Sequence, residues 1–229
     1  STRWLDGPPP ARYSHAAMII EQPVTLPVAA GIQLDARLAT PAGAVGGVAL
    51  CHPHPLYGGE MENPVVVRAA EVCRDAGLAT LRFDFRGVGA STGQHDEGRG
   101  ELDDLEAALN HLTTVVPTGV IAALGYSFGA SIAARVAMRR PLAGIALVAP
   151  ALAMKALADL DGLAAVSGRL LLVAGTADAY CPREALERLG RAVPRATVRT
   201  IEGADHFFFG KLFPLGEAIA PWAREVAGA

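Results

Sequence analysis

Two kinds of hydrophobic pattern divide the chain near residue 40. Residues 32–38 alternate apolar and polar side chains, which is typical of a half-buried strand, and a turn at Ala30 and Gly31 would pair this segment with a strand over 18–28. Beyond residue 40 the strands are continuously apolar and alternate with helical segments, as in a parallel sheet with crossover helices. The pattern predicts an α/β fold with an antiparallel edge.

The predicted parallel strands and the helices between them follow one another along the rest of the chain. The strands are predicted over residues 47–51, 79–85, 120–126, 144–149, 169–175 and 196–202. The helices are predicted over residues 65–75, 101–114, 131–140 and 215–226. Asn63 is expected to cap the first of these helices, with Pro64 at its first position and Gly77 at its end.

The length of 229 residues suits one large α/β domain. Residues 1–15, which contain three consecutive prolines, are expected to form an extended arm, and residues 16–229 a single domain. Only 18 residues separate Pro150 from the strand at 169, which is too few for a separate lid domain.

Composition and charge narrow the class of protein. The formal net charge of −3 gives no reason to expect a nucleic-acid partner or a membrane contact, and the apolar runs are too short to cross a bilayer. We expect a cytoplasmic protein. The alternative is an exported protein whose signal segment has already been removed. Cys51, Cys73 and Cys181 lack C-x-x-C spacing and are expected to be reduced thiols. The sequence does not predict an oligomeric state.

One serine stands between two glycines where a predicted strand ends. Ser127 lies in the sequence Gly125-Tyr126-Ser127-Phe128-Gly129. A tight strand-to-helix turn holds such a serine in a strained conformation at the carboxyl end of the sheet, where side chains in place of the glycines would collide with neighbouring elements. The pattern predicts a nucleophile, with the Phe128 amide as one oxyanion donor. An ordinary glycine-rich turn is the alternative.

A serine nucleophile needs an imidazole base and a carboxylate that orients it. Parallel strands all end at the same edge of the sheet, so these partners should follow the ends of later strands. Asp178 follows the strand over 169–175, and His206 follows the strand over 196–202. The order Ser127, Asp178, His206 is also the chain order associated with this type of turn. We therefore predict these three residues as a catalytic triad.

Other residues are weaker candidates for these roles. His15 lies in the predicted arm and His111 on a predicted helix, so we expect solvated or packing roles for both. His95 lies on a loop that leaves the same edge of the sheet and is kept as a residue that could border the site. Asp205 adjoins His206 but should point to the opposite side of the chain.

Asp84 and Arg86 are expected to order the loop that follows the strand over 79–85, through an ion pair or hydrogen bonds to the backbone. Three consecutive aromatic residues, Phe207, Phe208 and Phe209, adjoin the predicted base. They could line an apolar acyl subsite, but we expect at least two of them to belong to the core.

The loop after the strand over 47–51 should supply a second oxyanion donor. Prolines at 53 and 55 have no N–H, which leaves the amides of His54, Leu56 or Tyr57; His54 is the first choice and Leu56 the second. His52 and His54 also allow a metal-site interpretation. Because no third ligand stands nearby at a recognisable spacing, we expect neither a metal nor a cofactor.

Four segments of the chain together resemble the α/β-hydrolase superfamily. They are residues 50–63, 82–91, 125–130 and 205–208, which read LCHPHPLYGGEMEN, RFDFRGVGAS, GYSFGA and DHFF. The chain is similar, from about residue 30 to its end, to small bacterial serine hydrolases without a lid, close to the dienelactone-hydrolase and carboxylesterase branches. The resemblance implies an eight-stranded, mostly parallel sheet with helices on both faces. It also implies Ser127, Asp178 and His206 as the triad and the Phe128 amide as one oxyanion donor.

The chain departs from this pattern at two positions. Dienelactone hydrolases have a cysteine where this chain has Ser127, so lactone opening does not carry over. Pro64 stands where a basic residue is expected after Asn63, which alters the mouth of the site.

We therefore expect a serine hydrolase of the carboxylesterase type that cleaves esters or thioesters of small or short-chain acyl groups through an acyl-enzyme. Its rate should fall at acid pH, because the base must be neutral to accept a proton. An acyltransferase with the same triad, or a non-catalytic interaction protein on the same fold, are the alternatives.

Overall fold

The computed structural model describes residues 20–154 and 160–228. The arm predicted over residues 1–15 and the histidine at position 15 therefore lie outside the described residues.

Cys51, Cys73 and Cys181 are buried free thiols.

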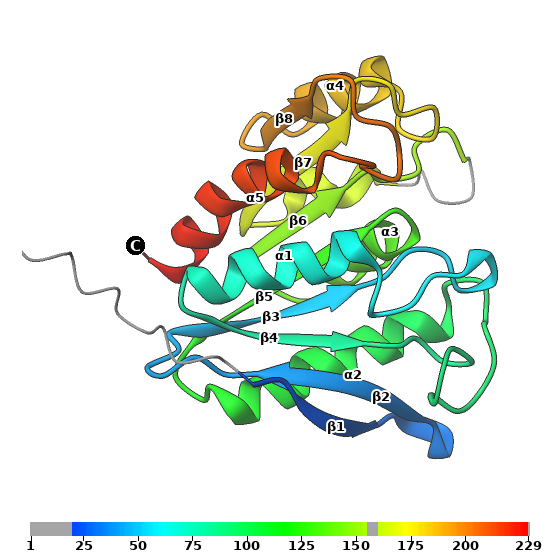
Figure 1. Cartoon of the computed structure of the whole chain (residues 1–229), viewed down its shortest axis with the longest axis vertical. Coiled ribbons are helices and arrows are strands. Elements are labelled where there is room, and N and C mark those ends of the chain that lie inside the picture. Colours follow the sequence, from blue (N-terminus) through cyan, green and yellow to red (C-terminus); the bar gives the residue numbers. More distant parts are fainter. Residues whose placement is uncertain (1–19, 155–159, 229) are drawn as a thin grey trace, which may run out of the picture.

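Within the described residues, eight strands form one sheet with the order β1-β2-β4-β3-β5-β6-β7-β8 (Figure 1). The strands are β1 Gln22–Pro27, β2 Gln33–Ala39, β3 Gly46–Cys51, β4 Leu78–Phe83, β5 Val120–Tyr126, β6 Gly144–Val148, β7 Arg169–Gly175 and β8 Thr197–Ile201. β2 is antiparallel to both β1 and β4, and the other neighbouring pairs are parallel. The predicted mostly parallel sheet with an antiparallel edge is confirmed.

The register aligns the carboxyl ends of the central strands. Cys51, the last residue of β3, pairs with Phe83 of β4 and with Gly125 of β5. Tyr126 pairs with the last residue of β6, and Gly175 pairs with the last residue of β8. The loops that follow these strands therefore leave the sheet at the same edge.

Helices cover both faces of the sheet (Figure 1). They are α1 Pro64–Asp75, α2 Gly100–Val115, α3 Phe128–Ala137, α4 Arg183–Ala192 and α5 Leu212–Ala227. α1 and α5 bury apolar side chains such as Val66 and Ile219 against one face, together with Leu50 of β3. α2, α3 and α4 bury side chains such as Leu105 and Ile132 in a second core on the other face.

Several predicted boundaries were wrong by a few residues. α3 begins directly after Ser127 rather than at residue 131, because the turn itself starts the helix and tertiary packing overrides the low helix propensity of Gly129. β4 ends at Phe83, two residues before the predicted end, and α5 starts three residues earlier than predicted. α4 was not predicted, although Leu186 and Leu189 already have helical spacing.

The connection between β6 and β7 contains, in its described part, a short 3-10 helix, Asp161–Ala165, and no separate lid domain. Among the described residues, no helix combines the length and apolar character needed to cross a membrane.

Candidate active site

Ser127 occupies the turn between β5 and α3. Its backbone has φ of 56° and ψ of −112°, a conformation that residues other than glycine rarely adopt, and the residue is 8% exposed. Its N–H donates to the Val148 carbonyl at 2.9 Å, which ties the turn to the end of β6. This strain, of the order of 1–3 kcal/mol, persists because packed strands and a helix fix both ends of the turn.

The flanking glycines are required by close backbone contacts. A Cβ atom on Gly125 would lie 2.1 Å from the Gly129 carbonyl oxygen. A Cβ atom on Gly129 would lie 2.5 Å from the Cys51 carbonyl oxygen and 2.6 Å from that of His52. Both separations are far below van der Waals contact, so the predicted steric reason for the two glycines is confirmed.

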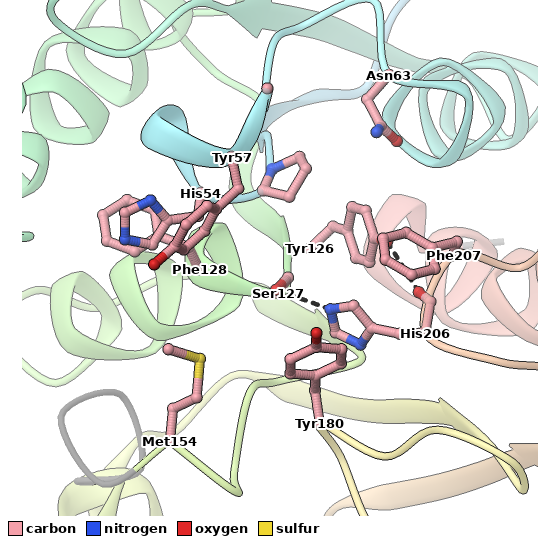
Figure 2. Close-up of a pocket in the computed structure, with 12 residues that line it drawn as sticks. His54, Tyr57, Asn63, Tyr126, Ser127, Phe128, Met154, Tyr180, His206 and Phe207 are labelled. Atoms are coloured by element: carbon pink, nitrogen blue, oxygen red, sulfur yellow. Dashed lines mark hydrogen bonds between the residues drawn. The ribbon is translucent and has the colours of Figure 1, made fainter.

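The structure brings Ser127, His206 and Asp178 together, and Figure 2 shows the contact between Ser127 and His206. The His206 Nε2 atom lies 3.0 Å from Ser127 Oγ, and His206 Nδ1 lies 2.9 Å from Asp178 Oδ2. Asp178 Oδ1 also accepts hydrogen bonds from the Tyr180 and Cys181 amides, at 2.8 and 2.9 Å. A carboxylate fixed in this way holds the imidazole with Nε2 directed at the serine hydroxyl.

Asp205 takes part in a different contact. Its Oδ1 atom accepts the Phe207 N–H at 3.0 Å and the Phe209 N–H at 3.4 Å, which closes the turn that follows His206. The carboxylate in contact with the imidazole is that of Asp178, the acid predicted from the sequence.

The loop after β3 lies beside Ser127, as expected for a second oxyanion donor. The Leu56 N–H donates to His54 Nδ1 at 3.2 Å, and the Tyr57 N–H donates to the His54 carbonyl at 3.1 Å. Both of these amides are therefore engaged within the loop, which favours the His54 amide over the second choice, Leu56. The His54 ring lies 4.9 Å from the Phe128 ring, so the loop packs directly on the start of α3.

The histidines of this loop have structural contacts that weaken the metal-site alternative. His52 is fully buried; its Nε2 accepts the Phe85 N–H at 3.0 Å and its Nδ1 lies 2.6 Å from the Pro53 carbonyl oxygen. Burial lowers the pKa of His52 to about 4. His52 is therefore a neutral ring whose two nitrogens are already in use. Among the described residues, no group of three or more His, Cys, Asp or Glu side chains could hold a metal ion.

His95 is not among the residues that line the pocket, but it packs against two that are. Its ring centroid is 4.9 Å from that of His54 and 5.6 Å from that of Phe128, and its Nδ1 atom lies 2.6 Å from Glu101 Oε1. Burial, followed by the proximity of His95, lowers the pKa of His54. His95 thus supports the loop that carries His54.

Asp84 and Arg86 order loops through different partners. Asp84 Oδ1 accepts the Met61 N–H at 2.7 Å, which anchors the loop before α1. The Arg86 guanidinium forms a buried ion pair with Asp104 of α2, with its closest contact at 2.7 Å. The predicted structural role of both residues fits these contacts.

A pocket of about 320 Å³ opens beside Ser127 (Figure 2). Its described lining carries no Asp, Glu, Lys or Arg side chain. The lining residues are Pro53, His54, Tyr57, Gly58, Asn63, Tyr126, Ser127, Phe128, Met154, Tyr180, His206 and Phe207.

The three consecutive aromatic residues after His206 differ in environment. Phe208 is fully buried, whereas Phe207 and Phe209 are 53% and 78% exposed. The expectation that at least two of them belong to the core was wrong. The turn closed by Asp205 directs alternate side chains outward, and Phe207 lines the pocket.

Met154, Tyr180 and Tyr126 line the pocket but were not identified as site residues from the sequence. Met154 follows β6 and Tyr180 follows β7, so their position after strand ends was an available signal. Tyr126 has its hydroxyl bonded to the His206 carbonyl, a contact between residues 80 positions apart that no local pattern indicates.

Comparison with known proteins gives consistent matches to one superfamily. A family model of serine aminopeptidases, S33, matches residues 64–165. The structure of an α/β serine hydrolase homologue from Coxiella burnetii is 33% identical, with a TM-score of 0.80 over 87% of this chain and 96% of that one. The chain belongs to the α/β-hydrolase superfamily.

Two further relatives of this α/β-hydrolase cover most of its length. A serine hydrolase without a lid from Xanthomonas campestris is 29% identical, with a TM-score of 0.76 over 88% of this chain and 94% of that one. An uncharacterized protein of Rickettsia prowazekii is 34% identical over an alignment of 196 residues, and the match covers 82% of each chain. Fold and family support hydrolase activity, and the relation to the dienelactone-hydrolase and carboxylesterase branches stays a prediction.

Proposed function

We propose that this α/β-hydrolase is a serine esterase that cleaves small carboxylic esters, and thioesters of similar size, through an acyl-enzyme. The observation that carries the proposal is the continuous contact from Asp178 through His206 to Ser127 Oγ, with separations of 2.9 and 3.0 Å. Such an arrangement activates a hydroxyl that is otherwise a weak nucleophile at neutral pH.

In the acylation half, the Ser127 oxygen attacks the ester carbonyl carbon while His206 Nε2 accepts the hydroxyl proton. Asp178 stabilises the imidazolium that forms. The carbonyl oxygen becomes an oxyanion, for which we assign the Phe128 and His54 amides as donors. When the carbon–oxygen bond of the ester breaks, the leaving alcohol takes the proton from Nε2.

In the deacylation half, a water molecule attacks the acyl-enzyme and His206 accepts its proton. The second tetrahedral species uses the same two amide donors. Its collapse releases the carboxylic acid and returns the proton to Ser127, so the free enzyme is restored without a cofactor.

Pocket size and charge support small, neutral substrates. A volume of about 320 Å³ lies at the lower end of the range for small-molecule sites. An aminopeptidase, the activity named for the matching family model, must bind a charged α-amino group. No described lining residue carries a carboxylate that could do so. Ester cleavage is therefore favoured over removal of amino-terminal residues.

The proposal is tested by assaying the wild type and Ser127→Ala against esters and thioesters of increasing acyl length. We expect highest kcat/KM for short acyl chains and a loss of about 10⁴-fold or more in Ser127→Ala. Added alcohols separate hydrolysis from acyl transfer, since a transferase would yield the new ester in preference to the acid. Full activity of Ser127→Ala would refute the proposal.

A further inference from the structure

Asn63 has a side-chain amide whose two ends face different surroundings. Its Oδ1 atom accepts the Val65 N–H at 3.0 Å and so caps the first turn of α1. This bond identifies the oxygen, because an amide nitrogen could not accept from a backbone N–H. The Nδ2 group must therefore point the other way.

The Nδ2 group is a free donor at the wall of the pocket. Asn63 lines the pocket, and Figure 2 shows its nitrogen on the side of Ser127 and its oxygen on the side of α1. Within residues 20–154 and 160–228, no protein group accepts a hydrogen bond from Nδ2. Both of its N–H groups are available to a bound molecule.

The surrounding loop holds this donor in place. The Asn63 N–H donates to the Glu60 carbonyl at 3.1 Å, and the Asn63 carbonyl accepts the Val67 N–H at 3.0 Å. The Met61 amide is fixed by Asp84 at 2.7 Å. A donor fixed on the end of a helix loses little conformational entropy when it binds a ligand.

The position of Asn63 indicates which part of an ester it faces. Figure 2 shows Asn63 and Phe207 on the same side of Ser127 as His206, whereas Tyr57 and Met154 lie on the other side. In the proposed reaction the leaving oxygen takes its proton from His206 Nε2, so the alcohol portion lies on the His206 side.

We propose that Asn63 Nδ2 is a specificity-determining donor for an uncharged oxygen acceptor, such as an ether, hydroxyl or carbonyl oxygen, on the alcohol portion of the ester. The inference rests on the proposed function. A neutral acceptor is favoured because the described lining contains no Lys or Arg, and because Pro64 occupies the position where a basic residue was expected.

Two esters of equal size test this assignment: n-butyl butyrate and 2-methoxyethyl butyrate, in which one methylene of the alcohol is replaced by an ether oxygen. The variants are Asn63→Asp and Asn63→Ser. Both side chains can accept the Val65 N–H and so keep the helix cap, but neither presents an amide donor to the pocket. Unchanged thermal unfolding of both variants verifies that the cap is kept.

We expect each variant to lower kcat/KM for 2-methoxyethyl butyrate about tenfold more than for n-butyl butyrate, as for the loss of one neutral hydrogen bond. Any general effect of the Asp charge cancels in this ratio. Equal changes for both esters would overturn the inference. So would a selective loss on butyl methoxyacetate, whose ether oxygen lies in the acyl portion. Ser127→Ala, in contrast, should abolish hydrolysis of all three esters, so failure of the proposed function is seen separately.

Discussion

The Tyr126 hydroxyl donates a hydrogen bond of 2.8 Å to the carbonyl oxygen of His206. Tyr126 is the residue before Ser127, and His206 lies on an irregular loop after β8. The two rings also pack together, with centroids 5.6 Å apart. The Tyr126 side chain, at the end of β5, therefore fixes the backbone of His206, whose imidazole contacts Ser127.

We expect Tyr126→Phe to lower kcat about tenfold with little change in KM. The aromatic packing is kept, but the His206 carbonyl loses its donor and the imidazole is less well fixed relative to Ser127. Steady-state kinetics on a short-chain ester measures this, with urea unfolding as the control for stability. A variant with wild-type kcat would mean that the hydroxyl does not position His206.

Two neighbouring carboxylates can be compared directly. Asp178→Asn should lower kcat by about 10³- to 10⁴-fold, because an amide nitrogen facing His206 Nδ1 favours the wrong tautomer. Asp205→Asn is the matched control: its side-chain oxygen can still accept from the Phe207 N–H, so we expect kcat within about threefold of the wild type. If both variants lost activity equally, the assignment of Asp178 would be wrong.

Buried His52 should make stability depend on pH. Burial lowers the pKa of His52 to about 4 in the folded chain, against about 6.5 in an unfolded chain. Between these two values the unfolded chain binds the extra proton. The contribution of His52 to the free energy of unfolding is therefore full above about pH 6.5 and is lost as the pH falls towards 4. The whole effect amounts to about 3 kcal/mol.

Urea unfolding at several pH values between 4 and 7 measures this effect. His52→Gln is the comparison, because its side-chain oxygen can accept the Phe85 N–H but does not titrate. We expect the free energy of unfolding to fall more steeply with decreasing pH in the wild type than in the variant. The contributions of other titrating groups cancel in the difference between the two proteins. Parallel curves would show that His52 does not titrate on unfolding.

The sequence was sufficient to bring distant residues to one site because neighbouring parallel strands end at a common edge of the sheet. Ser127, Asp178 and His206 follow three such strands, so their mutual proximity required no knowledge of side-chain packing. The Gly125 requirement could be predicted because a Cβ atom there would meet the backbone of Gly129, four residues along the same turn. The Gly129 requirement could be predicted because the turn packs against a neighbouring strand, whose end at Cys51 a Cβ atom would meet.

Features that depend on tertiary contacts could not be obtained in this way. The Tyr126 bond to His206 joins β5 to a loop after β8, and the orientation of the Asn63 amide depends on a pocket formed by several loops. The start of α3 was misplaced because helix propensity at Gly129 is outweighed by packing against the end of β3. The exposure of Phe207 and Phe209 follows from a turn that their composition does not reveal.

The central claim, that Ser127 is a nucleophile activated by His206, is tested most directly by labelling with a fluorophosphonate and mass spectrometry of the intact and digested protein. The serine oxygen displaces fluoride and forms a stable phosphonyl ester, as in acylation. We expect a single adduct on the peptide that contains Ser127, much slower labelling of His206→Ala, and none on that peptide in Ser127→Ala. Ester hydrolysis by a wild-type protein that remains unlabelled at Ser127 would contradict the account.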